Sequence, residues 1–278
     1  MVLSSYVNIA RQAQDFLEQG YTTVEIPSLM PVPTRFLKTF DGLIRDAERL
    51  GAAGEVKARK SSLVDMQGNG WSWGCDHIFA PALRRQALLD LVNLPPLPEI
   101  LNAILGPRMR LSGGHGHWSP ENYDYFLHWH RDTRPERWRF RNSDPRAHVQ
   151  VCLALRDERV VRIVPGSHLL DLTEADAQWI VDCPHERHPR EVIPTISAGS
   201  ALLLNTCTLH RAQCSSQDRR RSLHFGFTRV GATPEPGRRP KHFTWMADPK
   251  FLEAQSPFIR ACLEEQAAFT AKESLCEH

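Results

Sequence analysis

The sequence lacks several features that would place it in a special class of protein. It has no run of about 18 apolar residues, the length that a membrane-spanning helix needs. Neither sign of charge dominates, since Lys+Arg number 34 and Asp+Glu 32, and the composition gives no reason to expect binding to nucleic acid or to a membrane. The first residues do not combine a basic region with an apolar core, as a signal peptide does. We therefore expect a soluble, cytoplasmic protein.

The seven cysteines do not form the pattern of a disulfide-rich or zinc-binding protein. Their number is odd, and none of them stands in a C-x-x-C motif. Cys207 and Cys214 flank a histidine without the spacing of zinc ligands, and buried free thiols are the simplest interpretation. With 278 residues, 41% of them hydrophobic, the chain is long enough for one large domain or two small ones.

The first 108 residues are predicted to be mainly helical. Apolar residues recur at helical spacing in several segments, and glycine or proline ends most of them. We expect one short strand over residues 22–27. The expected helices cover residues 6–21, 33–51, 81–94 and 97–106. Residues 51–74 are polar and rich in glycine, which is typical of a loop with short strands.

The periodicity changes to that of strands at about residue 109. Short segments rich in β-branched and aromatic residues are separated there by Gly, Pro, Asn and Asp. They cover residues 108–119, 122–132, 147–155, 160–167, 191–197, 200–210 and 221–230. Close spacing of this kind predicts a β-sandwich or barrel.

Two further helices are expected around these strands. Asp171 or Thr173 can cap a helix over residues 171–183, and residues 248–273 predict a C-terminal helix. The predicted fold class is therefore mostly β with flanking helices. We predict a single domain over residues 1–278, with a helical part (1–108), a core of strands (109–230) and a C-terminal helical extension (231–278).

The sequence "HWHRDT" at residues 128–133 carries the pattern of a metal site. His130 and Asp132 lie on one face of an extended segment, because side chains alternate along a strand. His210 ends an apolar strand segment further along the chain, which would bring a second imidazole to the rim of the barrel. Two imidazoles and one carboxylate form the facial triad that binds Fe(II) and leaves its other positions open. We therefore expect His130, Asp132 and His210 to bind iron.

The strand at residues 220–229 carries polar residues on one of its faces. Arg220, Ser222 and His224 share this face, whereas apolar side chains occupy the other. An arginine and a hydroxyl that face a cavity suit a carboxylate, which the guanidinium binds with two hydrogen bonds. An iron site beside an anchored dicarboxylate is the pattern of a 2-oxoglutarate-dependent oxygenase.

The motifs "HWHRDT", "HVQVCLAL", "VPGSH" and "RRSL" together resemble the phytanoyl-CoA dioxygenase family of iron- and 2-oxoglutarate-dependent oxygenases. The resemblance extends over residues 8–230. It implies a double-stranded β-helix, the cupin-like jelly roll, as the core. It also implies Fe(II) bound by His130, Asp132 and His210, 2-oxoglutarate and O₂ as co-substrates, and an arginine on the eighth core strand that binds the distal carboxylate of 2-oxoglutarate.

Two arginines compete for this last role. Counting from the last ligand histidine in the better-known members of the family favours Arg221. The pattern Arg, any residue, small residue, aliphatic residue favours Arg220 together with Ser222, as does the alternation of side chains along the strand. The chain also departs from the family, because Arg211 and Ala212 replace a common Gly-Ser pair and the connection before "VRIVPGSH" is shorter.

Other residues near these motifs are candidates for the site. Gln150 can bond to 2-oxoglutarate or simply line the barrel. His128 can replace a metal ligand or face the pocket, and His168 in "PGSH" is interpreted as holding a turn next to the ligands. The residues considered for substrate contact or for support of the ligands are His128, Trp129, Arg134, His168 and His224. Trp129 is equally suited to the core.

The segment at residues 134–146 is basic, with five arginines against two acids. It is interpreted either as a lid that recruits an anionic or aromatic substrate or as a solvated loop. We expect a small-molecule partner, with no nucleic acid and no membrane. The oligomeric state does not follow from the sequence.

The predicted activity is oxidation, most simply hydroxylation, of a small organic metabolite, with release of succinate and CO₂. Asp132 favours hydroxylation, because a carboxylate fills the position that related halogenases leave open for chloride. Desaturation, rearrangement and endoperoxidation use the same ligands and are alternatives. Two other classes compete: a non-catalytic binding protein, and a cupin-type metal enzyme independent of 2-oxoglutarate, which would leave the Arg220 face without a purpose.

Overall fold

Two antiparallel sheets form the core of the computed structural model, which describes residues 2–59, 73–119, 124–132, 139–141, 144–232 and 244–276. The larger sheet consists, in spatial order, of β1 (Tyr21–Glu25), β8 (Ser200–Leu204), β6 (His148–Ala154), β10 (Arg221–Arg229), β4 (Met109–Trp118), β3 (Gly74–Asp76) and β2 (Ala58–Arg59). The smaller sheet consists of β5 (Tyr125–Phe126), β9 (His210–Cys214) and β7 (Val161–Ile163).

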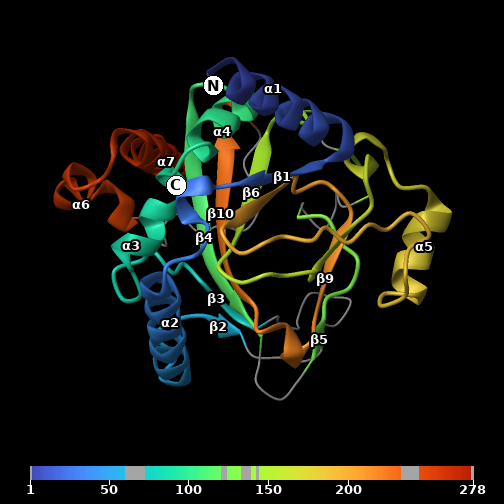
Figure 1. The fold of residues 1–278 in the computed structure, drawn as a ribbon, viewed down its shortest axis with the longest axis horizontal. Helices are drawn as coiled ribbons and strands as arrows, with labels where there is room; N and C mark the ends of the chain where they lie inside the picture. The colour runs from blue at the N-terminus through green and yellow to red at the C-terminus, as the bar shows by residue number, and fades with distance from the viewer. Residues whose placement is uncertain are drawn as a thin grey trace.

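Most helices lie on the side of the larger sheet that faces away from the smaller one (Figure 1). The α-helices of the described residues are α1 (Val2–Gln19), α2 (Thr34–Ala52), α3 (Gln86–Leu89), α4 (Leu97–Leu105), α5 (Glu174–Asp182), α6 (Pro249–Glu253) and α7 (Pro257–Cys276). Helices α2, α3, α6 and α7 cover this outer side, and α1 and α4 close the upper end in the view of Figure 1. Helix α5 lies apart from them, beyond β9.

Strand β10 shows why the layers separate. Leu223, Phe225 and Phe227 are buried in one core cluster with apolar residues of the outer helices, and the ring of Phe225 stacks on Phe79 at a centroid distance of 5.2 Å. Each fully buried side chain of this size contributes about 1.5–3 kcal/mol to stability. Because side chains alternate along the strand, the residues between these three face the interior between the two sheets.

The predicted fold class is confirmed: the chain is mostly β with flanking helices around a jelly-roll core. Of the two candidate caps of α5, the structure shows Thr173, whose hydroxyl accepts a hydrogen bond from Asp176 N at 3.0 Å, while the Asp176 carboxylate accepts one from Thr173 N at 3.2 Å. The other candidate, Asp171, accepts a hydrogen bond from Arg141 N at 2.8 Å instead. The strands β1, β2 and β3 extend the larger sheet from the part of the chain that was expected to be mainly helical.

Several predicted elements are shorter in the structure than in the sequence pattern. The helix expected over residues 81–94 begins only at Gln86, and the expected C-terminal helix is divided at Pro257, which lacks the backbone N–H that a continuous helix requires. The segment expected as a strand over residues 191–197 forms isolated bridges only. This segment has the composition of a strand, but its backbone pairs only at Val192 and Ile196.

Among the described residues, no single helix has both the length and the hydropathy of a membrane span. The helical segments Gln86–Asn93 and Leu97–Leu105, which meet at an angle of 62°, reach that composition only when they are taken together.

Candidate metal centre

His130, Asp132 and His210 meet in the structure. Their ligand atoms lie within 4.8 Å of one another. The Asp132 carboxylate lies between the two imidazoles, with Oδ1 3.6 Å from His130 Nε2 and Oδ2 3.8 Å from His210 Nε2. Two imidazole nitrogens and a carboxylate oxygen at these separations can close on one divalent ion after small side-chain movements.

Backbone hydrogen bonds hold the two ligand segments together. His130 and His210 exchange two N–H to carbonyl bonds, both of 2.9 Å, and Asp132 N donates to Thr206 O at 2.8 Å. Arg131, the buried residue between His130 and Asp132, donates hydrogen bonds to the carbonyl oxygens of Ser167 and Leu170. The segment is thereby fixed although its regular strand, β5, ends before it.

The route of the chain to His210 differs from the prediction. The apolar strand β8 ends at Leu204 in the larger sheet, and a turn then carries the chain to the smaller sheet, where His210 begins β9. Asn205 builds this turn, because its carbonyl accepts from Thr208 N and its side-chain oxygen from Cys207 N. His210 therefore opens a second strand, and the interpretation of one continuous strand was wrong.

Gly20, at the end of α1, supports the same turn. Its carbonyl accepts hydrogen bonds from Asn205 N (2.8 Å) and from Thr208 Oγ1 (3.1 Å). Gly20 has a φ of +80°, and a Cβ at this position would lie 2.2 Å from Thr208 Oγ1 and 2.6 Å from His168 Nδ1. The Gly20-Tyr21 pair thus allows α1 to approach the turn that presents His210.

The hydrogen bonds of the two histidines expose the same nitrogen of each ring. His130 Nδ1 lies 2.9 Å from His128 O, and His210 Nδ1 lies 2.7 Å from Thr208 O. A carbonyl oxygen can only accept, so each Nδ1 carries the hydrogen and each Nε2 presents a lone pair toward Asp132. Orientation of a ligand imidazole by a bond to its other nitrogen is typical of metal sites.

His210 is held neutral by its surroundings. Burial, together with the neighbouring His130, lowers the pKa of His210 to about 4, against the opposing effect of the Asp132 carboxylate. A neutral imidazole is the form that binds metal.

We expect the metal-free protein to lose stability as the pH falls from about 6.5 toward 4. In this window the unfolded chain takes up a proton at His210 that the folded chain does not, and the loss approaches about 3 kcal/mol at the lower limit. Thermal unfolding as a function of pH measures it. His210→Asn should flatten the curve in this window, and an unchanged slope in that variant would contradict the assignment.

A polar row faces the interior beside this cluster. The row consists of Arg220 and Ser222, with His224 two positions further along β10, and continues across the sheet to Gln150 of β6. Arg220 Nη2 lies 3.1 Å from His224 Nε2, and the Gln150 amide nitrogen lies 2.9 Å from His224 Nδ1. The His224 pKa is lowered by burial, by Arg220 and by nearby histidines, among them His210, so the row borders the candidate metal ligands.

Arg221 lies on the opposite face of β10. Its Nε donates to Asp41 Oδ1 of α2 at 2.7 Å, and one of its terminal nitrogens donates to the backbone oxygen of Arg220. The structure therefore brings Arg220 and Ser222 to the interior, and places Arg221 among the outer helices.

The interior row has unused hydrogen-bonding capacity. The fully buried Ser222 hydroxyl has no hydrogen-bond partner among the described residues. Arg220 donates from three of the five N–H groups of its guanidinium, to Glu158, Tyr125 and His224. A buried polar group without a partner costs about 1–3 kcal/mol, so a ligand that bonds to these groups would stabilise the site. A carboxylate fits them.

Glu158 and Tyr125 are the site residues that the sequence did not indicate. Glu158 lies in the connection between β6 and β7, and its Oε2 accepts a hydrogen bond from Arg220 Nε at 3.0 Å. Tyr125 of β5 accepts a bond from Arg220 Nη1 at 2.8 Å. No local pattern marks either residue, because both act through contacts with a distant part of the chain.

The other predicted residues have different surroundings. Trp129 is buried with apolar residues near α5, and its indole donates to Glu186 O at 3.0 Å, which fits the core interpretation. His168 is buried, and its Nε2 lies 3.0 Å from Leu17 O of α1. The rings of His128 and His130 lie 5.6 Å apart between centroids. Arg134 lies outside the described residues.

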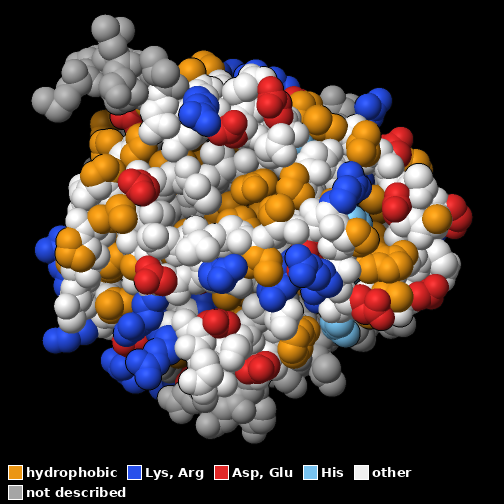
Figure 2. All heavy atoms as spheres, turned by 45° about the vertical axis from the view of Figure 1, so that its right-hand side comes forward, with side chains coloured by type: hydrophobic (Ala, Val, Ile, Leu, Met, Phe, Trp, Pro, Cys, Tyr) orange, Lys and Arg blue, Asp and Glu red, His pale blue; other side chains and the backbone are white. Residues whose placement is uncertain are grey.

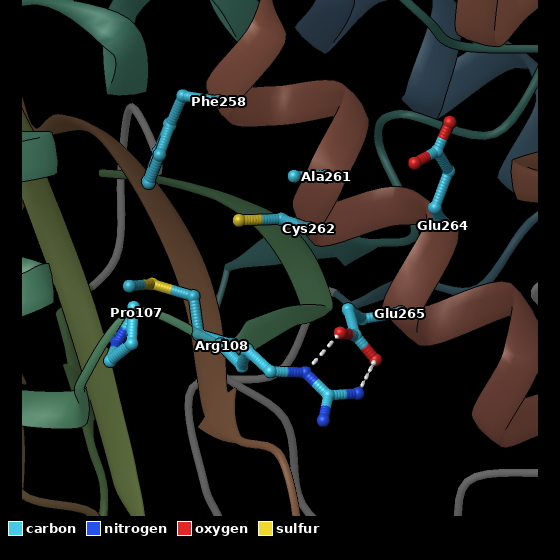
Figure 3. A pocket seen from close by; sticks show the side chains of 8 residues that line it. Pro107, Arg108, Phe258, Ala261, Cys262, Glu264 and Glu265 are labelled. Carbon is cyan, nitrogen blue, oxygen red and sulfur yellow. Dashed lines mark hydrogen bonds and ion pairs between the residues drawn. The ribbon is translucent and has the colours of Figure 1, made fainter.

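The surface offers less specific features. A groove of about 320 Å³ lies between the start of β4 and α7 (Figure 3), where the Arg108 guanidinium pairs with Glu265. The groove lies in the outer layer, and its lining does not include His130, Asp132 or His210. On the face shown in Figure 2, basic and acidic side chains stand beside one another, in line with a net charge of +2.

Comparisons with known proteins point to one family. Residues 118–222 match the family model described as phytanoyl-CoA dioxygenase. No curated protein sequence matches the chain. The matched segment contains His130, Asp132, His210, Arg220 and Ser222.

Solved structures of similar fold include SnoK, AviO1 and EctD. The carbocyclase SnoK from nogalamycin biosynthesis is 19% identical with a TM-score of 0.57, over 89% of this chain and 90% of SnoK. AviO1 from Streptomyces viridochromogenes Tue57 is 14% identical with a TM-score of 0.56, over 82% of this chain and 97% of AviO1. EctD from S. alaskensis, crystallised with 2-oxoglutarate and 5-hydroxyectoine, is 18% identical with a TM-score of 0.53, over 81% of this chain and 78% of EctD.

Proposed function

We propose that this chain belongs to the phytanoyl-CoA dioxygenase family of iron- and 2-oxoglutarate-dependent oxygenases, whose family model its residues 118–222 match, and that it hydroxylates a small organic metabolite. Succinate and CO₂ would be released from the co-substrate. The observation that carries the proposal is the convergence of three ligand atoms, from His130, Asp132 and His210, within 4.8 Å beside the interior row of Arg220 and Ser222.

The roles proposed for the residues follow from their contacts. His130 and His210 would bind Fe(II) through Nε2, because their Nδ1 atoms are held by backbone carbonyls. Asp132 would supply the negatively charged ligand. Arg220 and Ser222 would bind the distal carboxylate of 2-oxoglutarate, and Gln150 would hold His224 in place against Arg220.

When bound, iron, 2-oxoglutarate and O₂ supply the oxidising power that breaks a C–H bond of the substrate. The chain contributes ligand geometry, orientation and exclusion of water from a buried interior. Asp132 favours hydroxylation over halogenation, because its carboxylate occupies a ligand position. The side chain of Asp132 is 40% exposed, more than either histidine, so we propose that substrate approaches the metal from its side.

A rearrangement is the second candidate for the reaction. Among the proteins of similar fold, SnoK is a carbocyclase and SnoN an epimerase. Both proteins are non-heme and depend on alpha-ketoglutarate, so the candidate ligands of this chain are compatible with either outcome.

The test is an anaerobic titration of metal-free protein with Fe(II) and then 2-oxoglutarate. We expect the weak visible charge-transfer band of the iron-bound 2-oxo acid, and succinate after O₂ is admitted. A folded, iron-loaded protein that gives no band would contradict the proposed function and favour a binding protein or a 2-oxoglutarate-independent enzyme.

A further inference from the structure

Glu158 places a second carboxylate against the arginine that we assign to 2-oxoglutarate. The side chain of Glu158 is 0% exposed and that of Arg220 is 2% exposed, and Nε and Oε2 lie 3.0 Å apart. Two backbone hydrogen bonds with Ile196, of 2.9 and 3.0 Å, fix the position of Glu158. The carboxylate is therefore buried against the Arg220 guanidinium.

The second oxygen of this carboxylate is unsatisfied. Glu158 Oε1 is buried and has no hydrogen-bond partner among the described residues. The Ser222 hydroxyl, from the same interior row, is in the same condition. Two unpartnered polar groups beside one buried guanidinium indicate a place for a ligand that can bond to both.

Four buried ionisable groups near the pair carry no charge near pH 7, and the Asp132 carboxylate, which also acts on Cys152, adds a negative charge to the region. Burial raises the pKa of the Tyr125 hydroxyl and of the Cys152 thiol, and it raises the pKa of Cys214 to about 11. Burial, followed by Arg220, lowers the pKa of His224. All four groups are neutral near pH 7, so the charge of Glu158 already balances that of Arg220.

A distal carboxylate that binds to Arg220 makes two anions around one buried cation. Two carboxylates that share a buried site hold a proton between them, because they cannot both remain ionised at short distance. We propose that 2-oxoglutarate binds with the uptake of one proton from solvent, which lies between Glu158 and its distal carboxylate. This inference rests on the proposed function, and it makes Glu158 a residue that contacts the co-substrate and sets its affinity.

The test is calorimetric binding to the Fe(II)-loaded protein without O₂, in two buffers of different protonation enthalpy. The probes are 2-oxoglutarate and 2-oxopentanoate, which has the same chain length without the distal carboxylate. We expect 2-oxoglutarate to take up about one proton more than 2-oxopentanoate near pH 8, and its affinity to fall about tenfold for each pH unit in this range. Equal proton uptake for the two acids in the wild type would overturn the proposal, whatever the variants do.

Glu158→Gln should abolish the extra proton uptake and should bind 2-oxoglutarate at least about tenfold more tightly at pH 8, with little pH dependence. The matched control is Glu191→Gln, since the side chain of Glu191 is 3% exposed, nearly as buried as that of Glu158, and pairs among the described residues with Arg162, Arg187 and Arg211 instead of Arg220. This control should behave as the wild type. Proton uptake that persists in Glu158→Gln would assign the proton to another group, such as His224, and overturn the proposal. Failure of both 2-oxo acids to bind would instead overturn the proposed function itself.

Discussion

His210→Ala is expected to abolish iron binding and turnover. The substitution leaves one imidazole and one carboxylate, and the backbone carbonyl of Thr208 loses the imidazole that it orients. Loss even of a group that only supports a ligand costs about 10–100-fold in metal affinity, so loss of the ligand should cost at least about 100-fold. Titration with Fe(II), followed by the charge-transfer band with 2-oxoglutarate, measures the effect.

Two further variants separate loss of the ligand from loss of the fold. Asp132→Asn removes the negative ligand from a side chain that is 40% exposed, so it should leave the unfolding temperature almost unchanged while iron affinity falls. His185→Ala changes an exposed histidine near Phe126 and should bind iron as the wild type does. Wild-type iron affinity in His210→Ala would exclude this histidine from the metal centre.

Arg220→Ala is expected to weaken 2-oxoglutarate binding at least about 100-fold, whereas Arg221→Ala should leave it unchanged. Charge-assisted hydrogen bonds to a carboxylate contribute about 1.5–3 kcal/mol each. Arg221 pairs with Asp41 at the outer helices, and a pair of this exposure contributes less than about 1 kcal/mol to stability. Titration of the iron-loaded variants with 2-oxoglutarate distinguishes the two arginines.

Arg220→Ala also leaves Glu158 buried without its cation, which costs about 3–5 kcal/mol of stability. The double variant Arg220→Met with Glu158→Gln removes both charges, so it should regain much of the stability and still fail to bind 2-oxoglutarate tightly. Recovery of binding together with stability would show that Arg220 acts only through the fold. A loss of binding in Arg221→Ala alone would reverse the assignment of the two arginines.

The sequence by itself determined the features that depend on neighbouring residues. Alternation along β10 separates Leu223, Phe225 and Phe227 from the polar face, and the same alternation favours Arg220 over Arg221. For the cap of α5, the sequence left Asp171 and Thr173 as candidates, and the structure shows Thr173. The number and close spacing of the short strand segments were sufficient to predict a mostly β fold with flanking helices.

Only the tertiary structure decided which distant residues meet. His210 reaches His130 because the chain leaves β8 after Leu204 and passes through a turn to the other sheet. The periodicity of the sequence does not predict this change of sheet. Glu158 is 62 residues from Arg220 in the chain and meets it only because the connection after β6 folds into the interior. Local preference fixes the direction of a side chain within its strand, but contacts between distant segments, such as the Glu158–Arg220 ion pair, depend on packing of the whole core.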